Sequence, residues 1–129
     1  MKFSRTARAG LLASLLLVTT ACEAADWREA ETEPCRLGSL YERVDCVTQL
    51  TAQWDRRLNA AYERAMHMID PARARTLRDV QRKWIEWRDA NCGWYAHQAG
   101  TMSLELEAEC LRVTTKQRAE ELEDFEDYY

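Results

Sequence analysis

The chain has 129 residues, of which 47% are hydrophobic and 31% are charged, and its formal net charge is −4. This length allows one domain of ordinary size, and the composition excludes both a disordered polar chain and a membrane protein throughout. Because only 4 glycines and 2 prolines are present, the chain has too few turn formers for an all-β sandwich or barrel, and it contains no glycine-rich nucleotide-binding motif.

Residues 1–25 have the pattern of a secretory signal peptide. A basic start is followed by an apolar run from Leu11 to Ala21, which is too short to span a membrane. The run ends at Cys22 in a pattern similar to a bacterial lipobox, in which this cysteine is lipidated; the alternative is ordinary cleavage in the small-residue stretch that follows. We therefore expect a protein of the periplasm or cell envelope, linked to a membrane only through a lipid on Cys22.

Cleavage before Cys22 makes the mature chain more acidic. It removes three of the 18 basic residues and none of the 22 acidic ones, so the net charge changes from −4 to −7. Such a surface disfavours nucleic acid, whose binding depends on basic contacts to phosphate, and it favours basic partners.

The five cysteines support export. Lipidation or removal of Cys22 leaves four, and an even number in an oxidising compartment indicates two disulfides. Residues 26–36 are polar, and we expect them to form a tether that ends at Cys35. No Cys-x-x-Cys pair occurs and the two histidines stand apart, so the sequence predicts neither a metal site nor a cofactor.

Three apolar stripes with alternating spacings of three and four predict three helices, over 38–69, over 71–97 and from Ser103 onward. Asp70 and Pro71 mark the first boundary as the cap and first residue of the second helix. The stripes are Leu40, Val44, Val47, Thr51, Trp54, Leu58, Ala61, Ala65 and Met68; then Leu77, Val80, Trp84, Trp87, Asn91 and Trp94; then Leu104, Ala108, Leu111, Thr115, Arg118, Leu122, Phe125 and Tyr129.

Both connections between the predicted helices are short, so consecutive helices should run antiparallel. The expected fold is therefore all-α: an up-down-up antiparallel three-helix bundle that forms a single helical domain over residues 37–129.

This topology favours one disulfide pairing. Cys92 and Cys110 lie nine residues before and after residue 101, so an antiparallel hairpin places them at equal height, and Cys35 then pairs with Cys46. Reflection about the first connection also brings Cys46 close to the level of Cys92, so Cys46–Cys92 with Cys35–Cys110 is the alternative.

Catalytic chemistry is not indicated. Neither His67 nor His97 belongs to a recognisable nucleophile–base pattern, and the cysteines are expected in disulfides. We therefore expect that the protein is not an enzyme.

A spaced set of residues between Cys35 and Leu122 resembles the LprI-like lysozyme inhibitor family of exported, helical, cysteine-bridged bacterial domains. The set comprises Cys46, then Leu58, Asn59 and Tyr62, then Gln81, Trp84, Arg88, Asp89 and Cys92, and last Gly100, Thr101, Cys110, Thr114 and Arg118. Most of these residues are expected to be structural: Trp84 in the core, Arg88 and Asp89 in salt bridges, and Asn59 and Gln81 in polar contacts to the backbone or to each other. The resemblance implies lysozyme inhibition as a function.

Two hypotheses follow. In the first, the acidic surface steers the protein to a basic lysozyme, and the 97–103 loop enters the catalytic cleft, where His97, Thr101 and Ser103 donate hydrogen bonds to its carboxylates. In the second, the protein is an envelope structural or interaction module with no lysozyme target, and its acidic residues 120–127 contact another envelope protein.

Overall fold

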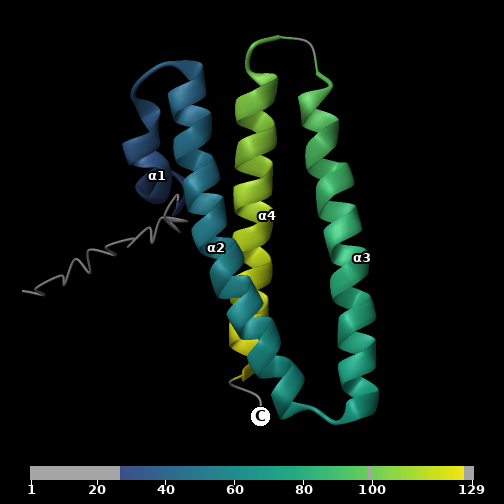
Figure 1. Cartoon of the computed structure of the whole chain (residues 1–129). Coiled ribbons are helices and arrows are strands. Elements are labelled where there is room, and N and C mark those ends of the chain that lie inside the picture. Colours follow the sequence, from purple (N-terminus) through teal and green to yellow (C-terminus); the bar gives the residue numbers. More distant parts are fainter. Residues whose placement is uncertain (1–26, 99, 127–129) are drawn as a thin grey trace, which may run out of the picture.

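The computed structural model describes residues 27–98 and 100–126, and these residues are helical with short connections (Figure 1). The elements are α1 (Trp27–Thr32), the 3₁₀ helix η1 (Glu33–Arg36), α2 (Leu40–Met68), α3 (Pro71–Ala96) and α4 (Ser103–Glu126). The expected signal peptide, with Cys22, lies outside the described residues. Among the described helices, none has the length and hydrophobicity needed to cross a membrane.

Two caps define where the long helices begin. Ser39 and Glu42 form a capping box at the start of α2, in which the Ser39 backbone N–H donates to the Glu42 carboxylate at 2.7 Å. Asp70 caps α3 as predicted, since its Oδ1 accepts from the backbone N–H groups of Ala72 and Arg73 at 2.9 and 3.1 Å. The chain therefore leaves α2 and enters α3 within two residues.

The three long helices run antiparallel in chain order, and α4 packs against both α2 and α3 (Figure 1). The all-helical prediction is confirmed. The predicted three-helix bundle is not confirmed, because α4 lies between α2 and α3 and keeps their backbones apart over most of their length. The molecule also has the two short elements α1 and η1 beside the start of α2.

Both disulfides have the favoured pairing, and the alternative pairing is wrong. Cys35–Cys46 and Cys92–Cys110 each join Cα atoms 5.4 Å apart. The first bond holds η1 against α2, and the second ties α3 to α4 near the loop that connects them. The equal-height argument therefore predicted the second bond correctly.

Residues 26–36 do not form the expected tether within the described part of the chain. From Trp27 to Arg36 the backbone is helical, as α1 and η1, and η1 contacts α2. The sequence looked like a linker because its stabilising contacts are to distant residues: the Cys35 disulfide and the ion pairs of Glu31.

The apolar core is small and lies mainly between α2 and α4. Its buried residues are Leu58, Ala61, Ala119 and Leu122, and the half-buried Trp54, Tyr62, Leu77 and Trp84 pack around them. Ala61 and Ala119 are completely buried, so their small side chains allow α2 and α4 to approach closely.

The predicted inner face of α3 is wrong over half its length. Val80, Trp87 and Trp94 are 46%, 55% and 60% exposed, whereas Gln81 and Cys92 are buried. The buried face of α3 is thus a different one from that predicted, and it includes residues with polar or sulfur side chains. Because α3 packs mainly on α4 and is joined to it by a disulfide, it buries a narrow stripe, and the tryptophans at heptad spacing face solvent.

Arg112 of α4 is completely buried and is neutralised by two carboxylates. Its Nη1 donates to Glu31 of α1 at 2.6 Å, and its Nε donates to Glu109 at 2.9 Å. Glu31 also accepts from Lys116 at 3.1 Å and from the Trp54 indole. Burial raises the pKa of Glu31, but these hydrogen bonds and the charges of Arg112 and Lys116 outweigh it and hold the pKa below its ordinary value.

We expect Glu31→Gln to lower the free energy of unfolding by about 2 kcal/mol near neutral pH, because it removes one of the two charges that neutralise Arg112. A carboxylate whose folded pKa is lowered stabilises the fold above its unfolded pKa, and this stabilisation is lost as the pH falls through the folded pKa. The variant should therefore lose less stability than the parent protein between neutral pH and about pH 4, as measured by urea unfolding.

Glu33→Gln is the matched control, since Glu33 is an exposed carboxylate two residues away, paired with Arg36. It should change stability by less than about 0.5 kcal/mol. Equal losses in the two variants would contradict the role given to Glu31.

Candidate functional site

Two places in the structure gather the residues singled out in the sequence. The first is the connection between α3 and α4, at one end of the molecule (Figure 1). The Cys92–Cys110 disulfide joins α3 to α4 close to this connection. Gly100 in the connection adopts a φ of 111°, a left-handed conformation that favours glycine. The loop is therefore a turn braced at its base.

The three predicted donors of this loop differ in the hydrogen bonds that they already make within the protein. His97 Nδ1 lies 2.6 Å from the Gly93 carbonyl, which can only accept, so Nδ1 carries the proton and a neutral ring offers only an acceptor outward. The Ser103 hydroxyl donates to the Gly100 carbonyl at 3.0 Å. The exposed Thr101 hydroxyl makes no hydrogen bond with the described residues, so among the three predicted donors it is the one left free for a partner.

The surroundings of the loop are apolar. Trp94 is 60% exposed and Met102 is 57% exposed, with Leu104 and Leu106 close behind them on α4. No lysine or arginine occurs between Gly93 and Glu107. This end of the molecule thus combines a chain turn with apolar surroundings and one large exposed aromatic side chain.

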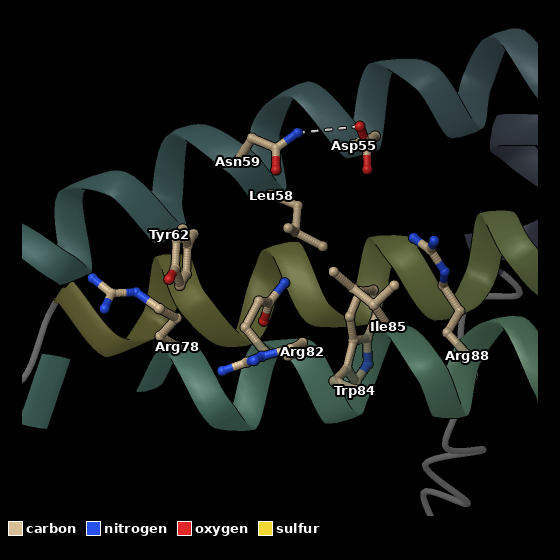
Figure 2. A pocket seen from close by; sticks show the side chains of 10 residues that line it. Asp55, Leu58, Asn59, Tyr62, Arg78, Arg82, Trp84, Ile85 and Arg88 are labelled. Atoms are coloured by element: carbon tan, nitrogen blue, oxygen red, sulfur yellow. Dashed lines mark hydrogen bonds between the residues drawn. The ribbon is translucent and has the colours of Figure 1, made fainter. Parts of the chain in front are cut away.

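The second place is a groove of about 320 Å³ between α2 and α3 (Figure 2). Its lining residues are Asp55, Leu58, Asn59, Tyr62, Arg78, Gln81, Arg82, Trp84, Ile85 and Arg88. The groove exists because α4 holds the other two long helices apart. Six of the residues that carry the family resemblance line it: Leu58, Asn59, Tyr62, Gln81, Trp84 and Arg88.

Several of these motif residues have contacts within the protein: Arg88 and Asp89 form an ion pair, whereas Gln81 bonds to an arginine side chain and not to the backbone or to Asn59. Gln81 is buried and accepts from Arg118 of α4 at 3.0 Å. The Arg88 guanidinium lies 5.0 Å from the centre of the half-buried Trp84 ring and donates to Asp89 at 2.9 Å. Because the Gln81–Arg118 hydrogen bond joins α3 to α4, it restricts the rotation of α3.

Asn59 differs from the expectation. It is exposed, and its side-chain amide donates to Asp55 of the same helix at 3.1 Å instead of bonding to Gln81 across the helices (Figure 2). The groove separates the two amides, so Asn59 lies on its wall.

Sequence reasoning missed two arginines of this groove, Arg78 and Arg82. They lie one helical turn apart on α3 and line the same wall (Figure 2). The available signal was the spacing of these two arginines. Residues four apart lie on the same face of a helix, and Ile85, three residues after Arg82, continues that face. This signal was overlooked because charged residues on a helix usually form a solvated face.

Both places offer contacts for binding. Within residues 27–98 and 100–126, no group of three or more His, Cys, Asp or Glu side chains is arranged to hold a metal ion. His67 is exposed on α2, away from both places.

The comparisons with known proteins agree with the resemblance seen in the sequence. A family model described as "Lysozyme inhibitor LprI" matches residues 35–122, a range that includes both disulfides, the α3–α4 loop and the groove. An uncharacterised protein of Rhizobium meliloti (strain 1021) is 30% identical over 105 residues, which cover 80% of this chain and 68% of that protein. No solved structure matches the chain significantly. The chain belongs to the lysozyme inhibitor LprI family, a family of exported proteins.

Proposed function

We propose that this protein binds a lysozyme and inhibits it. The observation that carries the proposal is the match to the lysozyme inhibitor LprI family over residues 35–122. The family is named for inhibiting an enzyme, which agrees with a molecule whose two candidate sites offer binding contacts.

The α3–α4 end is the surface that fits this function best. The catalytic site of a lysozyme is a cleft with two carboxylates, and a turn at the end of the molecule can enter a cleft whereas the α2–α3 groove cannot (Figure 1). Thr101 supplies a free hydroxyl donor for a carboxylate, and Trp94 and Met102 supply apolar area around it. The Cys92–Cys110 disulfide limits the conformational entropy that this end loses on binding.

The charge of α4 would assist the encounter. This helix carries eight acidic residues against three basic ones, so it would attract a basic lysozyme over a distance. Inhibition should accordingly weaken as salt screens this attraction.

Trp94→Ala should weaken inhibition by about thirtyfold, because a large aromatic side chain at the centre of an interface typically contributes about 2 kcal/mol. The measurement is lysis of a peptidoglycan suspension by a c-type lysozyme with increasing amounts of the purified, oxidised protein. Trp87→Ala is the matched control, since Trp87 is similarly exposed on the same helix but lies about two turns from the loop end. If both variants lose inhibition equally, the α3–α4 end is not the contact surface.

Thr101→Val should reduce inhibition by about fivefold, because it removes one hydrogen-bond donor while keeping the shape of the side chain. Ser103→Ala should have a smaller effect on inhibition, since its hydroxyl already donates to Gly100. Neither change should move the thermal unfolding midpoint by more than about 3 °C. Full inhibition by Thr101→Val would exclude this hydroxyl as a contact.

Absence of inhibition at a large molar excess, at both low and physiological salt, would contradict the proposal if the protein is folded and oxidised. The alternative function, an envelope interaction module without a lysozyme target, would then be pursued by isolating partners of the acidic α4 end.

A further inference from the structure

We propose that the α2–α3 groove binds an acidic, partly apolar peptide segment of another protein. This site goes beyond the proposed lysozyme inhibition, because the groove is concave and lies on a part of the molecule that the α3–α4 loop does not include.

The charge of the groove is opposite to that of the chain. The whole sequence has an excess of acidic residues, but α3 carries six basic residues against three acidic ones. Three arginines of α3, Arg78, Arg82 and Arg88, line the groove together with a single carboxylate, that of Asp55 on α2. Arg88 is also paired with Asp89, which lies outside the groove, so the excess of positive charge rests mainly on Arg78 and Arg82. An anionic ligand is therefore complementary to this groove.

The donors in the groove are available to a ligand. Arg78 makes no ion pair with any residue that the structure describes. Arg82 pairs with Asp79 at 2.5 Å, but both side chains are about two-thirds exposed, so a ligand carboxylate can replace this partner at little cost. The Tyr62 hydroxyl faces the groove from the opposite wall and has no hydrogen bond within the described residues (Figure 2).

The groove also offers apolar surface. Leu58 is buried beneath it, Trp84 is half-buried, and Ile85 is 40% exposed between the arginines. A ligand with charge alone would leave this surface without a partner, whereas a leucine or phenylalanine beside an acidic residue would cover it.

The length of the groove fits a short extended peptide. Arg78 and Arg88 are ten residues apart on one helix, which corresponds to about 15 Å, the length of four or five extended residues. On the α2 wall, the Asp55 carboxylate and the side-chain carbonyl of Asn59 can accept hydrogen bonds from the N–H groups of such a peptide. A phosphate polymer has few such donors and no apolar side chains, so the groove favours the peptide.

The test uses the oxidised protein as exported and, as the probe, a blocked hexapeptide of alternating glutamate and leucine, with the affinity measured by titration calorimetry. Arg78→Gln with Arg82→Gln should weaken binding about tenfold or more, because each arginine contributes a charge-assisted hydrogen bond. Arg75→Gln with Lys83→Gln is the charge-matched control, since both residues are exposed on α3 and neither lines the groove. The control should weaken binding by less than about threefold.

A second measurement follows the indole N–H signals by nuclear magnetic resonance, and it needs no variant. The peptide should shift the signal of Trp84, which lines the groove, and leave that of Trp87 in place. Equal weakening in the two double variants, no shift at Trp84, or equally tight binding of inorganic polyphosphate would each overturn the proposal. Retained lysozyme inhibition in the Arg78/Arg82 variant would separate this groove from the surface that inhibits lysozyme.

Discussion

The fold depends on neutralising one buried charge. Arg112 lies inside the molecule with no exposed surface, and an unpaired guanidinium there would cost several kcal/mol. Glu109 on the same helix supplies one carboxylate, and Glu31 supplies the other from 81 residues away in the chain. The Cys35–Cys46 disulfide keeps α1 and η1 close to α2, so it lowers the entropy lost when Glu31 is ordered. A short segment with little apolar area is thereby made part of the domain.

The central position of α4 explains the remaining architecture. This helix buries polar residues along with apolar ones: Arg112, Thr114 and Thr115 are all buried. Polar groups need partners in defined directions, so these contacts specify how the neighbouring helices are rotated more strictly than apolar packing alone. Because α2 and α3 each pack on α4, the sides of α2 and α3 that face each other are only partly buried, and the groove between them stays open.

The sequence contained enough information for the three long helices, their order and the favoured disulfide pairing, and not enough for α1 and η1 or for the faces of α3. Asp70 and Pro71 specify a local boundary, and the equal height of Cys92 and Cys110 follows from topology. Trp87 and Trp94 follow the same three-four spacing as a buried row, so hydropathy places them inside, while the real inner row includes a glutamine. The burial of Arg112 could not be predicted either, since its carboxylate partner lies in a segment with the composition of a linker.

Some motif residues of the groove form hydrogen bonds within the protein and are not free to bind a ligand. Gln81 and Arg88 face inward and bond to Arg118 and Thr115 of α4, at 3.0 and 3.5 Å, so they are already used within the protein. A ligand therefore meets mainly the exposed side chains next to them, in particular Arg78. The inward pair determines the angle at which α3 presents that arginine, because a helix held by directional hydrogen bonds cannot rotate freely. Substituting the inward residues should thus alter binding through geometry, even though they offer few donors of their own.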